Sequence, residues 1–361
     1  MRAPRLGVRL FALTAVLAIL ATACSSDSGD GADPSASGGA CTPADTPVIT
    51  FAAYSTPREV YGKIISAFQT KWKDEHDGQQ VIFQESYGGS TTQAQNVVNG
   101  FEADVVALSL GPDVDYIADA GLITHDWTAE ADGGMVSTSV VVLDVRPGNP
   151  KGFADFSDIG AAGVGVLTPD PASSGGARWN IVAMYGAAMR GFAGVTEGDE
   201  AGAQTLLTNV FHNVIALDKS ARDSIKNFEA GNGDVAITYE NEVFTAQDAG
   251  LPDEAVYPPS TILIENPATV VDVNVDKHCV RDAAEAFVEY LHSDEAKEYY
   301  RTVGSLRPTD AAAAAAGDKE MGFPPIQDLW TVDDFGGWKA LDEKLFSDSG
   351  VFTQAFNAAQ G

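Results

Sequence analysis

Apolar positions after Pro47 alternate between two spacings, one typical of strands and one typical of helices. The short run from Val48 to Ala53 is mostly apolar, which predicts a buried strand. In residues 57–74 the apolar side chains recur three or four positions apart, which predicts an amphipathic helix. The apolar face of this helix consists of Val60, Ile64, Ile65, Phe68 and Trp72.

The same alternation continues to residue 316. Further strands are predicted at 80–84, 104–108, 136–145, 163–168, 214–217, 234–239 and 262–273. Further helices are predicted at 91–100, 176–190, 221–230, 282–292, 293–303 and 311–316. Repeated strand–helix–strand units indicate an α/β fold, in which helices cover both faces of a mainly parallel sheet.

The length of the chain, 361 residues, indicates more than one lobe. A single hydrophobic core usually stops growing at roughly 250 to 300 residues. The long extended segments 136–145 and 262–273 would pass between two lobes. We expect one lobe at 47–137 plus 268–361 and a second, inserted lobe at 138–267. Ligands usually bind in the cleft between such lobes.

The N-terminus has the pattern of an export signal. Three arginines, at positions 2, 5 and 9, flank an apolar run from Leu10 to Leu20 that is too short to span a membrane. The residues before Cys24 resemble the cleavage box of bacterial lipoproteins, although Ala21 stands where Leu is more usual. We therefore expect a signal peptide at 1–23 and a lipid on Cys24. The alternative is ordinary cleavage that leaves Cys24 as a free thiol.

A lipid on Cys24 would anchor the exported protein to the outer face of the cytoplasmic membrane. Residues 24–46 are rich in Ser, Gly and Asp, so this segment predicts a flexible tether. With Cys24 lipidated, Cys41 and Cys279 form an even pair in an oxidising compartment, and we expect a disulfide between them. The alternative is two unrelated buried cysteines.

The charge of the chain excludes some partners. It has 22 basic against 51 acidic side chains and a net charge of −29, which argues against nucleic acid as a partner, since binding to its phosphates needs Lys and Arg.

The cysteines lack zinc-ligand spacing. No Walker loop, nucleophile elbow or H-E-x-x-H motif is present, and the five histidines are expected on the surface. We therefore expect neither a metal or other cofactor nor an enzyme.

Four predicted strands are each followed by a short turn with Ser or Gly and then by a helix. These turns are Tyr54-Ser55-Thr56-Pro57, Gly88-Gly89-Ser90-Thr91, Ser173-Ser174-Gly175-Gly176 and Lys219-Ser220-Ala221-Arg222. The carboxyl ends of the strands line the ligand crevice in open α/β sheets, so four helix N-termini can point into one cleft. Each offers unpaired N–H groups and a positive dipole end, which together predict an anion site. The alternative is that these residues only cap helices.

Three arginines, Arg58, Arg178 and Arg222, fall in the first turns of these helices, where the helix dipole disfavours a cation. We expect them to pair with protein carboxylates such as Glu240 and Glu242, or else with the anion. Glu240 and Glu242 are expected on a strand, and we do not expect this pair to act in acid–base catalysis.

Several motifs resemble the bacterial sulfate-binding proteins of ABC importers. The similarity runs in order from Phe51 to Thr353, and its most specific part is the string S-S-G-G-A-R-W-N at 173–180. The other matching segments are 86–90, 100–106, 146–151, 233–235, 240–242 and 334–338. The resemblance implies a two-lobed periplasmic-binding-protein fold of type II, with a mainly parallel sheet in each lobe. It also implies a monomer that holds one sulfate by neutral donors and delivers it to membrane permease subunits and their ATPase.

The resemblance also implies the residues that would contact sulfate. These are Ser55, Ser90, Ser174, Gly175, Gly176, Ala221 and Tyr239. Two of them depart from the family pattern: Ser55 stands where Asp is usual, and Tyr239 where Trp is usual. Thiosulfate, or another tetrahedral oxyanion, is the alternative ligand, and an extracytoplasmic enzyme is the less favoured alternative function. However, thiosulfate binders tend to lack the two consecutive glycines that this chain keeps at 175 and 176.

Overall fold

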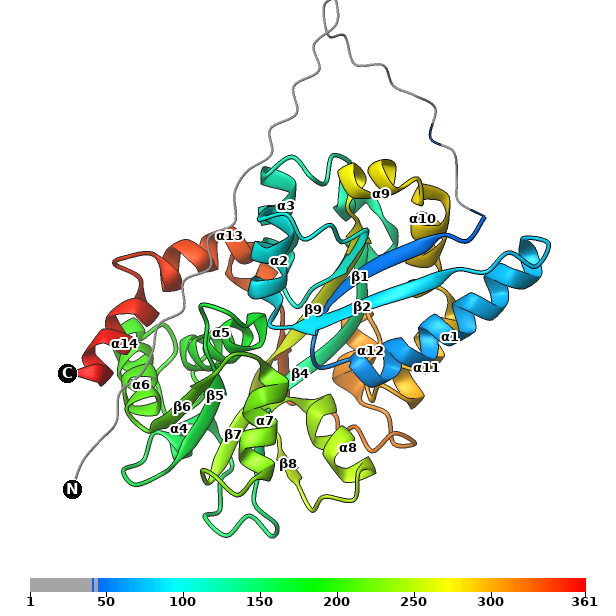
Figure 1. The fold of residues 1–361 in the computed structure, drawn as a ribbon. Helices are drawn as coiled ribbons and strands as arrows, with labels where there is room; N and C mark the ends of the chain where they lie inside the picture. Colours follow the sequence, from blue (N-terminus) through cyan, green and yellow to red (C-terminus); the bar gives the residue numbers. More distant parts are fainter. Residues whose placement is uncertain (1–40, 42–44) are drawn as a thin grey trace, which may run out of the picture. The chain divides into compact units, whose positions relative to one another are not determined.

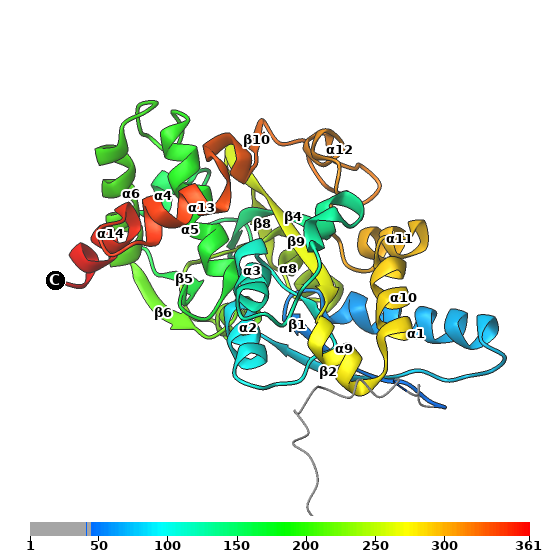
Figure 2. The same ribbon diagram turned by 90° about the horizontal axis from the view of Figure 1, so that it is seen from above.

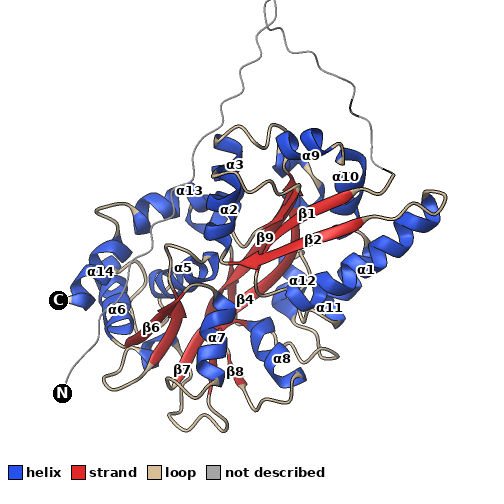
Figure 3. Ribbon diagram, viewed as in Figure 1, coloured by secondary structure: helices blue, strands red, loops and turns tan. Residues whose placement is uncertain are grey.

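Ten strands are present in the computed structural model, which describes Cys41 and residues 45–361. They are β1 (Val48–Tyr54), β2 (Ile82–Gly88), β3 (Val105–Ala107), β4 (Met135–Val145), β5 (Val166–Pro169), β6 (Val214–Asp218), β7 (Val235–Tyr239), β8 (Glu254–Val256), β9 (Ser260–Val270) and β10 (Asp328–Trp330). Eight of them form a continuous path in the order β2-β1-β3-β9-β4-β7-β5-β6. Figure 3 shows this path in red, with helices on either side.

The described part contains fourteen α-helices. They are α1 (Arg58–Glu75), α2 (Ser90–Val98), α3 (Gly111–Asp119), α4 (Phe156–Ile159), α5 (Gly175–Met189), α6 (Glu200–His212), α7 (Ala221–Glu229), α8 (Glu240–Asp248), α9 (Asp272–His278), α10 (Arg281–Leu291), α11 (Asp294–Thr302), α12 (Ala311–Ala316), α13 (Gly337–Leu341) and α14 (Val351–Gln360). None of the described helices is long and apolar enough to cross a bilayer.

Two long antiparallel strands, β4 and β9, connect two parallel halves of the sheet. The first half of β4 pairs with β9, while Val141–Val145 pair with β7. The last three residues of β9 pair with β3. On one side β1, β2 and β3 are parallel, and on the other β5, β6 and β7 are parallel. Figure 1 shows β4 and β9 running side by side between these halves.

Helices cover both faces of each half, as the continuous burial of β3, β5 and β7 requires. In β1, Phe51 and Ala53 pack against α1 and α10, whereas Ala52 packs with α2 and α3 on the opposite face. In the other half, α5 and α6 cover one face and α7 covers the other. The C-terminal α14 lies beside α6 in Figures 1 and 2 and shares its core.

The α/β fold class is confirmed, and most predicted elements lie within two residues of the observed ones. Strand β2 begins at Ile82 and not at Gln80, and the predicted strand at 262–273 ends at Val270, where the chain turns into α9. The predicted lobe boundaries stay a prediction. Within residues 332–361, however, Val351, Phe352 and Ala355 belong to the core of α5 and α6.

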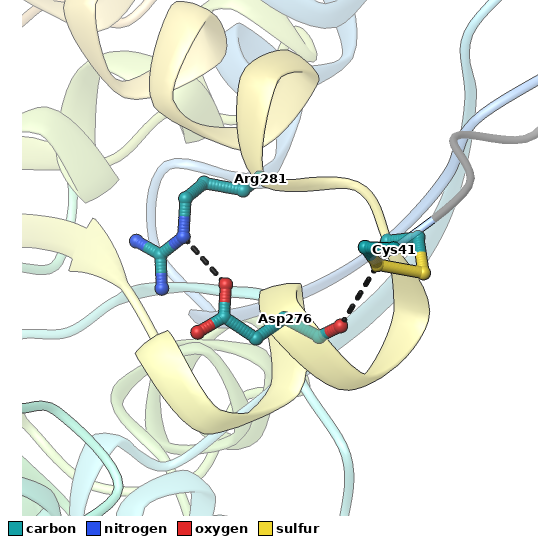
Figure 4. Close-up of a disulfide and its surroundings, with 4 residues drawn as sticks. Cys41, Asp276 and Arg281 are labelled. Atoms are coloured by element: carbon teal, nitrogen blue, oxygen red, sulfur yellow. Dashed lines mark hydrogen bonds and ion pairs between the residues drawn. A yellow bond between two sulfur atoms is a disulfide. The ribbon is translucent and has the colours of Figure 1, made fainter. Parts of the chain in front are cut away.

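The disulfide between Cys41 and Cys279 is present, as predicted. It joins the start of the described chain to the residue that ends α9, beside the ion pair of Asp276 and Arg281 (Figure 4). The signal peptide, Cys24 and most of the tether lie outside the described residues, so these expectations stay predictions.

A fully buried ion pair lies beside the paired strands β4 and β9. The Arg307 guanidinium donates to both carboxylate oxygens of Glu240, at 2.7 and 2.6 Å, and both side chains are 0% exposed. The same guanidinium donates to the carbonyl oxygens of Ala314 and Pro324, so its desolvated protons have partners. The Arg307 backbone pairs with Thr138 of β4. Sequence reasoning missed Arg307, because no motif surrounds it.

A second buried carboxylate, Asp144 of β4, has no such partner. Both of its oxygens are buried, and neither accepts a hydrogen bond from a described residue. Burial raises the pKa of Asp144 to about 9, and the negative charge of Asp253 adds to this effect. Asp144 is therefore protonated in the folded protein at neutral pH.

We expect Asp144→Asn to stabilise the protein at pH 8. The folded-state pKa lies above the unfolded value, so the wild type loses stability as the pH rises from about 4 to 9, by up to about 1.4 kcal/mol per unit. Asparagine does not ionise and avoids this loss. Urea unfolding of both proteins at several pH values measures the difference, with exposed Asp348→Asn as the control. A gain that does not grow with pH would contradict the assignment.

Candidate anion-binding site

All four predicted strand–turn–helix junctions are present, with α1 starting directly after its turn and α2, α5 and α7 starting within theirs. Ser90 and Ser174 are buried, at 1% and 2% exposure, whereas Ser55 is half-buried. Ser174 occupies the N-cap of α5, yet its hydroxyl makes no capping hydrogen bond. Ser220, by contrast, caps α7 in the ordinary way. The capping explanation therefore accounts for Ser220 but not for Ser174.

Three of the turns lie against one another. The backbone N–H of Thr92 donates to the Ser173 carbonyl oxygen at 3.2 Å, and the Ser173 hydroxyl donates to the Lys219 carbonyl oxygen at 2.9 Å. A Cβ atom on Gly89 would overlap the Ser173 carbonyl oxygen and would lie 2.7 Å from that of Lys219. Glycine is needed at position 89 because two other backbone segments approach it, and not because of its φ angle of −65°.

The consecutive glycines of α5 lie in an equally close-packed place. A Cβ on Gly175 would be 2.7 Å from the Ser109 hydroxyl oxygen. A Cβ on Gly176 would be 3.3 Å from the Ala221 Cβ and 3.5 Å from the Tyr239 ring. The structure thus brings Ser174, both glycines, Ala221 and Tyr239 together at the N-terminus of α5. The first N–H groups of a helix have no partner within it, so this terminus offers free donors.

Ser90 connects to a carboxylate behind it. Its hydroxyl donates to Asp113 at 2.5 Å and accepts the backbone N–H of Ser109 at 2.9 Å. Thr91 also donates to Asp113, at 3.3 Å. Burial raises the pKa of Asp113 to about 6, against the lowering effect of these hydrogen bonds. Asp113 is thus a buried hydrogen-bond acceptor in the first turn of α3.

Ser109 is the residue at this place that sequence reasoning missed. It follows β3 and precedes α3, and its hydroxyl lies 2.6 Å from that of Tyr239. Its carbonyl oxygen accepts from Trp179 at 2.8 Å and from Asn266 at 3.0 Å. The signal was available, because Leu108-Ser109-Leu110-Gly111 places a serine between a strand and a helix, as the four predicted turns do.

Beside these turns a groove of about 810 Å³ reaches the surface. Ser55 lines it together with residues of the other turns, among them Gly89, Ser173 and Ser220. Basic and acidic side chains both line the groove. The basic residues are Arg58, Lys219, Arg222 and Lys226, and the acidic residues are Glu59, Asp170 and Asp223.

Pairing of the first-turn arginines with protein carboxylates is confirmed for two of the three. Arg222 donates to Glu242 at 2.7 Å, to Glu59 at 2.7 Å and to the Thr56 carbonyl oxygen at 2.7 Å. Arg178 donates to Asp342 at 3.0 Å. Arg58 instead lies over the ring of Tyr87, 5.1 Å from its centroid.

Two expectations about charged residues are wrong. Glu240 and Glu242 lie in the first turn of α8 and not on a strand, because the chain turns directly after Tyr239. Each carboxylate pairs with a different arginine, Glu240 with Arg307 and Glu242 with Arg222. The histidines are not all on the surface either, since the side chain of His292 is 8% exposed. Among residues 45–361, no three His, Cys, Asp or Glu side chains are placed to hold a metal ion.

In this geometry, helix N-termini from two halves of an α/β sheet meet at one place, an arrangement that can bind a small anion. The sequence model of the bacterial extracellular solute-binding proteins matches residues 49–304. The chain therefore belongs to this family, whose members act outside the cytoplasm, and its resemblance to sulfate binders is confirmed.

Individual relatives are similar over most of their length. The sulfate-binding protein of Synechococcus elongatus is 39% identical over 92% of both chains. A thiosulfate-binding protein of Pseudomonas aeruginosa is 34% identical over 84% of this chain and 91% of its own. The structure of the sulfate-binding protein SubI from Mycobacterium tuberculosis superimposes with a TM-score of 0.73 at 36% identity, covering 83% of this chain and all of SubI.

We expect Arg222→Met to cost about 3 to 5 kcal/mol of unfolding free energy, because it leaves the buried Glu242 carboxylate, 1% exposed, without its cation. Glu59→Gln removes the outer partner of the same arginine. It should cost less than about 1 kcal/mol, because the Glu59 side chain is 49% exposed. Urea unfolding at pH 7 compares the two variants. If both variants lose a similarly small amount of unfolding free energy, water compensates the charge of the Glu242 carboxylate when Arg222 is removed.

Proposed function

We propose that the protein is a lipid-anchored extracytoplasmic solute-binding protein that captures sulfate and delivers it to an ABC importer. The observation that carries this proposal is the N-terminus of α5, where Ser174 is buried without capping the helix and Gly175-Gly176 meet Ala221 and Tyr239. An anion there would accept hydrogen bonds from neutral donors on several elements. The sulfate-binding relatives support the choice of ligand.

In this proposal the sulfate contacts come from the residues of the converging turns. Gly175, Gly176, Ala221 and Ser55 would donate from the backbone, and Ser174 and Tyr239 from the hydroxyl. The Ser90 hydroxyl, whose one proton goes to Asp113 in this structure, would have to turn from Asp113 to donate to the ligand. The arginines and Glu240 and Glu242 would support these turns without touching the ligand, because the carboxylates neutralise Arg178, Arg222 and Arg307. The ligand would then be held without a formal counter-charge, and no cofactor or catalytic group is needed.

The remaining parts of the proposal concern partners. The lipid on Cys24 would keep a monomer at the membrane, next to the permease subunits and their ATPase. Closure of lobes at 47–137 plus 268–361 and at 138–267 would enclose the ligand. The C-terminal α14 would be an exception to these bounds, because it packs against α6 of the second lobe and would move with it. Thiosulfate is the second candidate ligand, favoured by the relative from Pseudomonas aeruginosa. The retained Gly175-Gly176 pair favours sulfate.

We expect phosphate to bind more than about a hundredfold more weakly than sulfate at pH 7.5. Phosphate keeps at least one proton, which needs an acceptor, and an unmade hydrogen bond to a charged ligand costs about 3 kcal/mol. The buried carboxylate of Asp113, behind Ser90, already accepts from Ser90 and Thr91. Calorimetry with both anions measures the ratio. If phosphate binds within tenfold of sulfate, Asp113 must reach the ligand, and Asp113→Asn would then abolish phosphate binding.

We expect Gly89→Ala to lower sulfate affinity at least about tenfold. The added methyl group meets the carbonyl oxygens of Ser173 and Lys219, so the turns can no longer approach one another. Gly62→Ala is the control, since nothing lies within 4 Å of a Cβ at that place in α1. Calorimetry gives the affinities, and circular dichroism checks the fold. Unchanged affinity in a folded Gly89→Ala protein would show that this approach is not needed for binding.

A further inference from the structure

The Ser109 side chain lies inside the proposed anion site, although none of the predicted contacts includes it. The residue is 1% exposed and sits between β3 and α3. Its backbone is fixed from three sides: its N–H donates to the Ser90 hydroxyl, and its carbonyl oxygen accepts from Trp179 and Asn266. These bonds hold the Ser109 Cα in one place, so its hydroxyl can reach few neighbours.

One of these neighbours is the start of α5. A Cβ on Gly175 would lie 2.7 Å from Ser109 Oγ and 2.9 Å from Ser109 Cβ. The hydroxyl therefore lies against the first residue of the helix whose free N–H groups face the proposed ligand. No larger residue fits at position 175 while Ser109 keeps this place.

The other neighbour is Tyr239, whose hydroxyl lies 2.6 Å from Ser109 Oγ. Burial raises the pKa of Tyr239 well above its usual value, so the phenol stays protonated. Two hydroxyl groups hold two protons, and the hydrogen bond between them uses one. Among the described residues, Tyr239 is the hydrogen-bond partner of the Ser109 hydroxyl. When Tyr239 donates to Ser109, the Ser109 proton is left for an acceptor at the start of α5.

We propose that Ser109 Oγ is a further sulfate contact and that Tyr239, in place of the direct contact proposed above, is a positioning residue that acts on the ligand through Ser109. This inference rests on the proposed function, because it takes the anion to lie at the N-terminus of α5. A hydroxyl that accepts one hydrogen bond becomes a better donor for the next, so Tyr239 would strengthen the bond from Ser109 to the ligand.

Calorimetry of sulfate binding to the full-length protein tests the inference. Ser109→Ala should lower the affinity about 10- to 100-fold, the range expected for a hydrogen bond to a charged ligand. Tyr239→Phe should lower it less, about three- to tenfold. The double variant should bind like Ser109→Ala alone, because Tyr239 has nothing left to act through. The control is Ser224→Ala, which removes a buried serine hydroxyl on α7 that has no partner among the described residues.

Other outcomes overturn the inference in distinguishable ways. If Ser109→Ala binds sulfate within twofold of the wild type, Ser109 is not a contact. If the losses from the two single variants multiply in the double variant, Tyr239 contacts the ligand independently. If the wild type binds no sulfate, the proposed function fails, and the inference fails with it. Should Ser109→Ala not fold, Ser109→Cys keeps the size of the side chain with a weaker donor and should show the same direction of change.

Discussion

The antiparallel pairing of β4 with β9 is the constraint on which the rest of the structure depends. Each strand has eleven residues and pairs with its partner over only part of that length, so each also reaches into one parallel half of the sheet. Because of this arrangement the turn after β2 meets the turns after β5 and β6, and the turn after β3 meets the end of β7. The carboxyl ends of strands from both halves therefore face one place, which is where helix N-termini offer donors.

The polar groups at this place are buried, and a buried polar group is costly unless it is hydrogen-bonded. Asn266 of β9 shows how the structure meets this cost: its amide donates to the Ser109 carbonyl oxygen, and its own oxygen accepts from Tyr54 at 2.8 Å. Trp179 adds a second donor to the same carbonyl oxygen. Residues from β1, α5 and β9 thus hold the Ser109 turn in place, and a site built from such fixed donors needs little reorganisation to bind an anion.

The charges around the site are compensated in pairs. Arg222 lies between Glu59 and Glu242, Arg178 faces Asp342, and Arg307 faces Glu240. A chain with a net charge of −29 would repel an anion at long range, but salt screens this effect beyond about 8 Å. The electrostatic environment of an anion at the N-terminus of α5 is therefore set by the neutral hydrogen-bond donors close to it.

The sequence by itself determined the local structure and the kinds of residue at the site. Periodicity located β1, α1, α5 and α7 within two residues, because these elements have one clear apolar face or one continuous apolar run. It failed at Glu240 and Glu242, where a helix begins without any sequence gap after β7. The Ser–Gly turns were recognisable, since few residues other than glycine permit such close backbone contact.

Only the tertiary structure decided which of these residues meet. The approach of Ser109 to Tyr239, 130 positions apart, depends on how β4 and β9 join the two halves of the sheet. The pairing of Arg307 with Glu240 likewise joins segments that no local pattern relates. Hydrophobic periodicity records which face of an element is buried but not which distant element covers it. The long-range hydrogen bonds and ion pairs of this site therefore appear only once the chain has folded.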